Sequence, residues 1–154
     1  MENSNQIYNA YLESSGVSID SRSIKKGSLF FALKGPNFDG NQFANDALKK
    51  GASYVVVDDA NSLEINDKFF LVEDSLNALQ NLALHHRKQL KIPIIAITGS
   101  NGKTTTKELI REVLSQKFLV HSTHGNMNNH IGVPITILQI SKNHEVAIIE
   151  MGAN

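Results

Sequence analysis

The sequence predicts an α/β protein made of two consecutive parts. Short apolar runs rich in Val, Ile and Phe alternate along the chain with segments whose apolar residues recur at helical spacing. A Lys-Ile-Pro break at residues 91–93 interrupts this alternation. We therefore expect a small α/β domain over residues 1–90, followed over residues 91–154 by the first part of a second α/β sheet.

Helices and strands are expected to alternate through the first part. Helical spacing predicts helices over residues 5–14 and 42–50, and a third that Asp74 or Ser75 can cap and that runs to about residue 90. Runs of β-branched and aromatic residues predict strands at 17–20, 28–33, 54–57 and 69–72. Residues 34–41 are dense in turn formers and predict a loop.

The second part repeats this alternation around a Gly-rich turn. Residues 92–97 form an apolar run that predicts a buried strand, and residues 105–116 predict a helix. Further strands are expected at residues 118–121 and 145–150, with a polar loop at 125–132 between them. Residues 134–140 fit either a short helix or a strand, and the pattern leaves both open.

Composition excludes several classes of protein. The 154 residues carry 15 basic and 15 acidic side chains, so nothing in the net charge points to nucleic acid as a partner. The absence of cysteine excludes disulfides and thiolate zinc sites. The N-terminus is polar, and no apolar run approaches membrane-spanning length. We therefore expect a cytoplasmic protein with no membrane partner.

The turn between residues 97 and 105 carries the strongest functional pattern. A strand, a Gly-rich turn, a Lys-Thr pair and a helix form the arrangement that binds nucleoside triphosphates. The glycines let the backbone N–H groups approach phosphates, Lys103 can reach the β- and γ-phosphates as the catalytic cation, and the Thr104 hydroxyl can coordinate Mg²⁺. The expected nucleotide-binding residues are Gly99, Ser100, Asn101, Gly102, Lys103, Thr104 and Thr105.

This turn is a short form of the phosphate-binding loop. It reads Gly-x-x-Gly-Lys-Thr, and Ile97 occupies the position at which the longer pattern has a glycine. A match this short indicates a phosphate-binding loop only because a predicted strand precedes it and a predicted helix follows it. The alternative is an ordinary strand-to-helix turn with an exposed lysine.

Two further groups of residues can take part in a site at the strand ends. Glu150 ends an apolar strand, where an acid beside a phosphate loop can hold Mg²⁺, although a solvated carboxylate is the alternative. Asn126, Asn128 and Asn129 can bind a phosphate, sugar or amine, or can simply shape a turn. The irregular spacing of the histidines at 121, 124 and 130 argues against a metal cluster.

Four segments together resemble the Mur ligase family. The segments are Ser18–Arg22 with Gly27–Gly35, Ile97–Thr105, Gly125–Pro134 and Glu150–Asn154. The phosphate loop is common to Mur ligases and folylpolyglutamate synthetases. The segments at 125–134 and 150–154 are similar to those of the family member that adds D-alanyl-D-alanine.

The resemblance implies a role for each part of the chain. Residues 1–90 would hold a UDP-sugar substrate, with Ser21, Arg22 and Lys34 among the substrate-binding residues. Arg22 is equally compatible with a surface ion pair. Residues 91–154 would begin the central ATP-binding domain, with Thr104 and Glu150 at Mg²⁺. Asn126, Asn128 and Asn129 would lie near the nucleotide or the acceptor substrate.

The implied activity is ATP-dependent amide formation. ATP would convert the terminal carboxylate of UDP-N-acetylmuramoyl-tripeptide into an acyl phosphate, which D-alanyl-D-alanine would attack. In the family a further domain follows, so we expect these 154 residues alone to be inactive, to leave an unpaired sheet edge, and to come from a monomeric parent. The alternatives are another amino acid ligase of the superfamily and a non-catalytic nucleotide-binding module.

Overall fold

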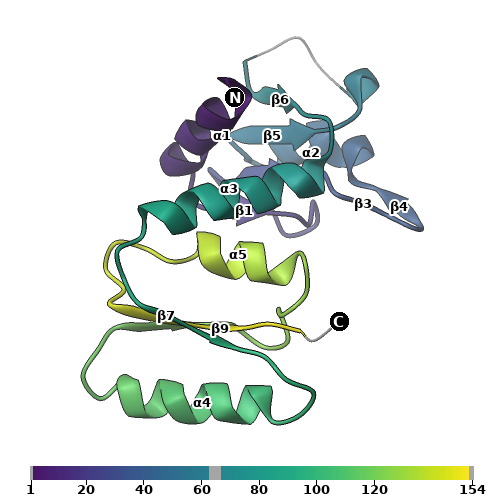
Figure 1. Cartoon of the computed structure of the whole chain (residues 1–154). Helices are drawn as coiled ribbons and strands as arrows, with labels where there is room; N and C mark the ends of the chain where they lie inside the picture. The colour runs from purple at the N-terminus through teal and green to yellow at the C-terminus, as the bar shows by residue number, and fades with distance from the viewer. Residues whose placement is uncertain (1, 63–66, 153–154) are drawn as a thin grey trace. The chain divides into compact units, whose positions relative to one another are not determined.

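The computed structural model describes residues 2–62 and 67–152 (Figure 1). The chain divides into two compact units, Met1–Leu82 and Ala83–Asn154. The division falls inside the helix α3 (Ser75–Gln89), ahead of the Lys-Ile-Pro break at which the sequence placed the domain boundary. Both units have α/β architecture, as the sequence predicts.

A parallel sheet forms the centre of the first unit. Its strands are β1 (Val17–Ser18), β2 (Leu29–Phe31), β5 (Tyr54–Val57) and β6 (Phe69–Leu71), in the order β1-β2-β5-β6. Every neighbouring pair is parallel. The four strands expected in this part are therefore present: β5 spans the predicted residues, and β1, β2 and β6 are shorter than the runs that predict them.

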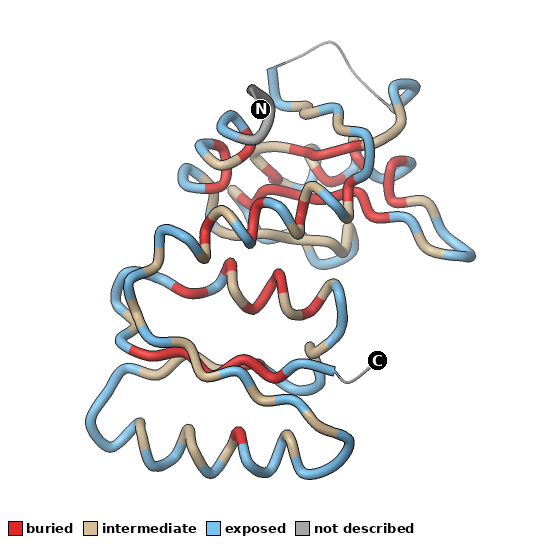
Figure 2. Tube along the Cα trace, in the orientation of Figure 1, coloured by how far each residue is buried: buried red, intermediate tan, exposed pale blue. Residues whose placement is uncertain are grey.

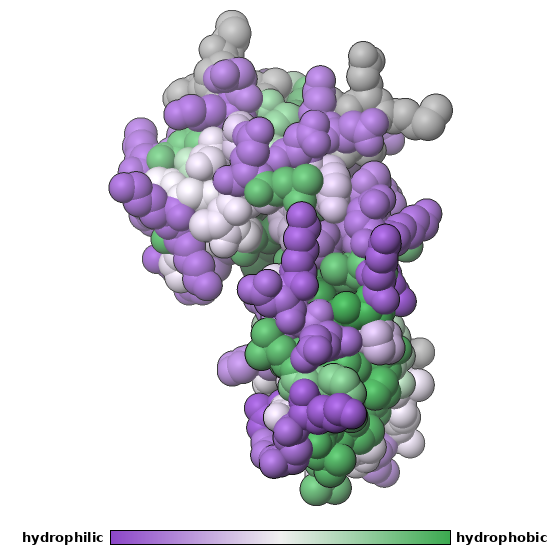
Figure 3. Space-filling view, turned by 90° about the vertical axis from the view of Figure 1, so that its left-hand side faces the viewer, coloured by the Kyte–Doolittle hydropathy of each residue, from purple (hydrophilic) through white to green (hydrophobic). Residues whose placement is uncertain are grey.

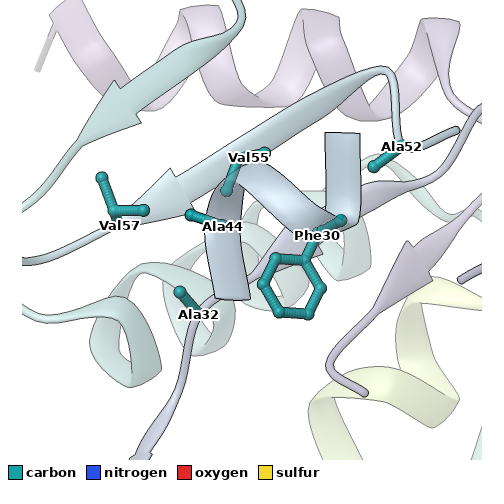
Figure 4. Close-up of a cluster of buried hydrophobic side chains, with 7 residues drawn as sticks. Phe30, Ala32, Ala44, Ala52, Val55 and Val57 are labelled. Atoms are coloured by element: carbon teal, nitrogen blue, oxygen red, sulfur yellow. The ribbon is translucent and has the colours of Figure 1, made fainter. Parts of the chain in front are cut away.

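One face of this sheet packs against the short helix α2 (Ala44–Lys49). Phe30 and Val55 are register partners, so their side chains point to the same face. There they meet the methyl groups of Ala44 and Ala47, whose small size lets the helix approach the sheet closely (Figure 4). The full buried cluster is Phe30, Ala32, Ala44, Ala47, Ala52, Val55 and Val57.

The helix α1 (Glu2–Glu13) lies beside the other face of the same strands. The Tyr54 hydroxyl, on the opposite face from Val55, donates a 2.8 Å hydrogen bond to the Glu13 carboxylate. The ring of Phe70 lies 5.9 Å from that of Tyr54, between centroids, and Val56 is fully buried. Helices therefore cover both faces of the sheet, as parallel strands require.

The segment expected to be a loop at residues 34–41 contains regular structure. Strands β3 (Lys34–Gly35) and β4 (Phe38–Asp39) form an antiparallel hairpin, and the 3₁₀ turn η1 (Gly40–Phe43) follows directly. A second 3₁₀ turn, η2, spans Ala60–Ser62. The hairpin strands are two residues long, too short for a period-two pattern to reveal them.

The second unit is a parallel sheet between two helices. Strands β7 (Ile94–Ile97), β9 (Val146–Glu150) and β8 (Val120–Ser122) pair in the order β7-β9-β8. The helices α4 (Lys103–Leu114) and α5 (Gly132–Leu138) lie on opposite faces of this sheet (Figure 1). The helical alternative is thus the correct one for the segment around Pro134.

Burial is concentrated in the central strand of this sheet. All five residues of β9 are buried, whereas β7 is only partly buried, contrary to the fully buried strand that its apolar run predicts (Figure 2). Among the described residues β7 pairs with β9 alone, which explains its exposure. Ala147 and Ile149 pack with Ile140 and with partly buried residues such as Ile137 on α5.

Apolar side chains also remain at the surface of the second unit. Figure 3 shows apolar and polar surface interspersed in the lower part of the view. Leu109 and Val113 on α4 are 64% and 71% exposed, and Leu119 before β8 is 53% exposed. No helix within residues 2–62 and 67–152 is both long enough and apolar enough to cross a membrane.

A pair of leucines on α3 tests how much the buried side of that helix stabilises the fold. Leu79 is fully buried and Leu84 is 53% exposed. We expect Leu79→Ala to lower the free energy of unfolding by about 2–5 kcal/mol, because it removes packed methyl groups and leaves a cavity. Leu84→Ala should change it by less than about 0.5 kcal/mol. Urea denaturation measures both; equal effects would contradict the packing described.

The histidine on β8 makes the stability of the second unit depend on pH. His121 is half-buried, its Nε2 lies 2.9 Å from the carbonyl oxygen of Thr136 on α5, and burial lowers its pKa from 6.5. Above that value both folded and unfolded states hold the ring neutral. Below it the unfolded chain binds the proton first, so the free energy of unfolding falls as pH decreases.

His121→Gln should therefore make the free energy of unfolding less dependent on pH between roughly 7.5 and 5.5, the range around the ordinary histidine pKa. Chemical denaturation of the variant and the parent protein at several pH values measures this slope. An unchanged slope would mean that His121 is as easily protonated in the folded chain as in the unfolded one.

Candidate functional site

The carboxyl ends of the three strands in the second unit meet at one edge of their sheet. Ile97 of β7 and Glu150 of β9 are register partners, although they are far apart in sequence. The N–H group of Glu150 donates a 2.8 Å hydrogen bond to the hydroxyl of Thr123, the residue after β8. Ligands of parallel α/β sheets bind at this edge.

The Gly-rich loop connects β7 to α4 at this edge. Gly99 and Gly102 adopt φ angles of +138° and +75°, which other residues rarely tolerate. Gly102 is the N-terminal cap residue of α4, so the helix starts at Lys103, two residues before the predicted start. The N–H groups of such a first turn have no acceptor within their own helix, which makes the turn suited to an anion.

Lys103 and Thr104 both lie in that first turn, and each has a defined partner. The Lys103 ammonium donates to the carbonyl oxygen of Gly99, so its side chain folds back over the loop. The Thr104 hydroxyl donates a 3.0 Å hydrogen bond to Oε2 of Glu150. The structure thus brings together the two side chains that the sequence proposes for Mg²⁺.

Glu150 is the centre of a hydrogen-bond network. Its side chain is 2% exposed, and each carboxylate oxygen has a partner. Oε1 accepts a 2.8 Å hydrogen bond from the amide of Asn128, while Oε2 accepts that of Thr104 and lies 3.8 Å from the Lys107 ammonium. The alternative of a solvated carboxylate does not describe this residue.

The network also contains two residues that the sequence did not indicate as part of the site, Lys107 and Thr123. Lys107 is fully buried, and its ammonium donates a 2.7 Å hydrogen bond to the carbonyl oxygen of Thr123. The available signal was its spacing: Lys107 lies three residues after Thr104 and three before Ile110, on the side of the helix that faces the sheet. A lysine at an otherwise inward-facing position indicates a buried charge with partners.

The asparagines that the sequence groups together occupy different positions in the structure. Asn128 contacts Glu150 through its side chain, and its carbonyl oxygen accepts a 2.6 Å hydrogen bond from the N–H of Gly152. The Asn129 side chain accepts hydrogen bonds from the N–H groups of Ile131 and Gly132, and so shapes the turn into α5. The carbonyl oxygen of Asn126 accepts from the N–H of Asn128.

The residues at the strand ends suit a hard divalent cation. Mg²⁺ prefers oxygen ligands and is commonly held by one or two protein groups together with phosphate oxygens. The Thr104 hydroxyl and the Glu150 carboxylate offer oxygens of this kind within hydrogen-bond distance of each other. Among residues 2–62 and 67–152, no group of three or more His, Cys, Asp or Glu is placed to hold a metal ion.

In the first unit, the predicted substrate residues near position 21 form a surface arrangement. Arg22 makes a bidentate ion pair with Asp20, with a shortest distance of 2.8 Å, and its side chain is 87% exposed. Hydrogen bonds from Arg22 lower the pKa of Asp20 to about 2. The carbonyl oxygen of Ser21 accepts a 2.8 Å hydrogen bond from Lys50.

Lys34 belongs to a second polar network, at the base of the β3–β4 hairpin. Its ammonium lies 2.8 Å from Oδ1 of Asp58, whose side chain is 8% exposed. The buried amide of Asn41 donates to both Asp39 and Asp58. Burial alone raises the pKa of Asp58, but hydrogen bonds from Lys34, the N–H of Ser75 and Asn41 outweigh it, so the pKa lies below its usual value.

The sequence of this chain matches family models and known proteins. Residues 13–105 match the model of the Mur ligase family, catalytic domain, and residues 97–154 match the Mur ligase middle domain. The chain is 45% identical over 139 residues to the UDP-N-acetylmuramoyl-tripeptide–D-alanyl-D-alanine ligase of Bacillus subtilis. It is 51% identical over 136 residues to the enzyme of the same name from Synechocystis.

These matches cover 89% and 88% of this chain but 30% of each relative, so the chain spans under a third of their length. A solved structure, that of the MurF ligase from Thermotoga maritima in complex with ADP, superimposes with a TM-score of 0.81 at 36% identity. The superposition covers 93% of this chain and 33% of the Thermotoga maritima chain. The family model that matches residues 13–105 spans more than half of the sequence, and the chain belongs to the Mur ligase family.

Proposed function

We propose that this chain supplies the nucleotide site and the UDP-sugar site of an ATP-dependent amide ligase. The reaction joins D-alanyl-D-alanine to UDP-N-acetylmuramoyl-tripeptide, a step of peptidoglycan precursor synthesis in the cytoplasm. The observation that carries the proposal is the Gly-rich loop at the start of α4, with Thr104 bonded to Glu150 beside it. The names of the relatives support the substrates.

The chemistry follows from the low reactivity of a carboxylate. An oxygen of the tripeptide's terminal carboxylate attacks the γ-phosphorus of ATP, the bond from that phosphorus to the β–γ bridging oxygen breaks, and ADP leaves. The amine of D-alanyl-D-alanine then attacks the acyl carbon, loses a proton and expels inorganic phosphate. No side chain needs to act as a nucleophile, so the protein contributes positioning and stabilisation of charge.

Each residue of the loop has a defined part in this scheme. The N–H groups around Ser100, Asn101 and Thr105 face the phosphates, and Lys103 moves from the Gly99 carbonyl to neutralise the charge on the transferred phosphoryl group. Thr104 and Glu150 would hold Mg²⁺, which when bound neutralises phosphate charge and polarises the γ-phosphorus. Asn126, Asn128 and Asn129 border the same edge of the sheet.

The first unit is proposed to hold the UDP-sugar through Ser21, Arg22 and Lys34. Arg22 can exchange its exposed Asp20 partner for a diphosphate, since guanidinium groups bind both bidentately. Lys34 stays paired with Asp58 and presents its partly exposed ammonium at the hairpin. The parent enzyme is proposed to act as a monomer.

Two alternative functions can be distinguished from this proposal by experiment. Another amino acid ligase of the superfamily would use the same loop with a different incoming amine. A non-catalytic nucleotide-binding module would need no UDP-sugar site. The high identity to ligases that add D-alanyl-D-alanine, across both units, favours the proposed activity over both.

Phosphate release from ATP tests the reaction in the full-length protein that carries this sequence. We expect release to require both UDP-N-acetylmuramoyl-tripeptide and D-alanyl-D-alanine. Lys103→Ala should lower kcat by about 100-fold or more, because it removes a cation from the transition state. Lys142→Ala, at an exposed position outside the site, is the control. Release that ignores D-alanyl-D-alanine would point to a different ligase.

A second variant tests the UDP-sugar site in the same protein. Arg22→Gln should raise KM for the UDP-sugar about 10- to 100-fold with kcat nearly unchanged, because it removes charged hydrogen bonds to the diphosphate. Asp20→Asn, which breaks the same ion pair but keeps the guanidinium, should leave KM within a few-fold. If neither variant changes KM, the Arg22–Asp20 pair is only a surface ion pair.

A further inference from the structure

Lys107 is a buried charged residue to which the proposed mechanism assigns no role. It lies on α4, behind the first turn that carries Lys103 and Thr104, and its side chain is 1% exposed. Lysine is almost never fully buried unless its charge is paired, because removing an ammonium group from water is costly. A lysine in such a position needs a reason beyond packing.

The partners of the Lys107 ammonium all lie at the strand-end edge of the sheet or next to it. It donates a 2.7 Å hydrogen bond to the Thr123 carbonyl and lies 3.1 Å from the Glu108 carboxylate and 3.8 Å from Glu150. Glu108 is half-exposed, whereas Glu150 is almost completely buried. Lys107 therefore places a full positive charge beside a carboxylate that water hardly reaches.

Lys107 and Thr104 approach the same oxygen of Glu150 from one side of α4. They are three residues apart, so their side chains lie one above the other on that side. Thr104 donates to Oε2, and the Lys107 ammonium lies 3.8 Å from the same oxygen. Asn128 donates to Oε1, and the Glu150 N–H donates to the Thr123 hydroxyl. The carboxylate is thus held from two segments of the chain, α4 and the turn before α5, while Thr123 holds the backbone of the same residue.

A direct role of Lys107 at the phosphates does not fit this geometry. Its ammonium is enclosed, whereas Lys103 in the preceding turn already faces the loop. Any effect of Lys107 on a ligand must therefore pass through another group. In the proposed function that group is Glu150, which is hydrogen-bonded to Thr104 in the first turn of α4.

We propose that Lys107 is a positioning residue that orients the Glu150 carboxylate toward the phosphate loop, and so sets the affinity for the divalent cation that accompanies the nucleotide. This inference rests on the proposed function, since it assumes that the loop binds a nucleotide with Mg²⁺. It adds a residue that never touches the ligand. Groups that orient metal ligands typically change metal affinity 10- to 100-fold when removed.

A double-mutant cycle in the full-length protein tests the proposal. The variants are Lys107→Gln, which can still donate a hydrogen bond to Thr123 but lacks the charge, Glu150→Gln, and the two combined. For each, calorimetry gives the Mg²⁺ concentration at which ATP binding is half-maximal, and the affinity for ADP in excess EDTA. Far-UV circular dichroism and thermal unfolding identify any variant that fails to fold.

We expect Lys107→Gln to raise the half-maximal Mg²⁺ concentration about 10-fold or more, and to change metal-free ADP affinity by less than about 3-fold. In the Glu150→Gln background, Lys107→Gln should have no further effect on Mg²⁺, because the two residues act in sequence. Lys107→Arg, which keeps the charge, should restore most of the affinity. Lys117→Gln, on an exposed lysine after α4, is the matched control.

Other outcomes overturn the proposal in distinguishable ways. If Lys107→Gln lowers ADP affinity with and without Mg²⁺ by the same factor, or lowers only the unfolding temperature, Lys107 is structural. Additive effects in the double variant would mean that it does not act through Glu150. If the parent protein binds no nucleotide at all, the proposed function itself fails, whatever the variants do.

Discussion

The buried carboxylate of Glu150 is the constraint around which the second unit is organised. A charge that is cut off from water must be matched by donors, and here the donors to the carboxylate come from α4 and from the turn before α5. The loop after β8 contributes an acceptor, because the Glu150 N–H donates to the Thr123 hydroxyl. Because the strands are parallel, all of these segments reach the same edge of the sheet. One residue, through its side chain and its backbone N–H, therefore links three segments of the chain.

The first unit meets the same requirement at Asp58. That carboxylate follows β5, is nearly buried, and is held by Lys34, by the amide of Asn41 and by the N–H at the start of α3. It links the hairpin, the 3₁₀ turn and a helix N-terminus into one network. In both units an acid at the end of a central strand connects segments that packing alone would hold loosely.

The fold was largely predictable because its strands are short, apolar and well separated. The runs at 54–57 and 145–150 are typical of buried strands, and the glycines and the Lys-Thr pair between Gly99 and Thr105 are typical of a phosphate-binding loop. The local sequence pattern could not predict which strands pair with each other. It could not show that β9 lies between β7 and β8, and so that β7 is partly exposed.

Only the site residues that lie in a recognisable motif or at the end of a predicted strand could be predicted from the sequence. The rule that ligands bind at strand ends grouped Thr104 with Glu150, and the two side chains are hydrogen-bonded to each other. Lys107 was missed because a lysine on a helix normally faces water, and that expectation outweighed its spacing relative to Thr104 and Ile110. Its contacts with Thr123 and Glu150 show that it is buried. The asparagines were grouped because they are adjacent, yet their side chains have separate partners.

The loop shows how handedness limits which sequences can form this edge. At Gly99 an added Cβ would meet no atom within 4 Å, so space does not demand glycine there. The φ of +138° does, because it belongs to a region of backbone conformation that chains of L-amino acids avoid. A substitution at Gly99 would leave its surroundings undisturbed and would instead turn the peptide planes of the loop. Chirality, acting through the direction of a few N–H groups, thus constrains this position more tightly than any neighbouring side chain does.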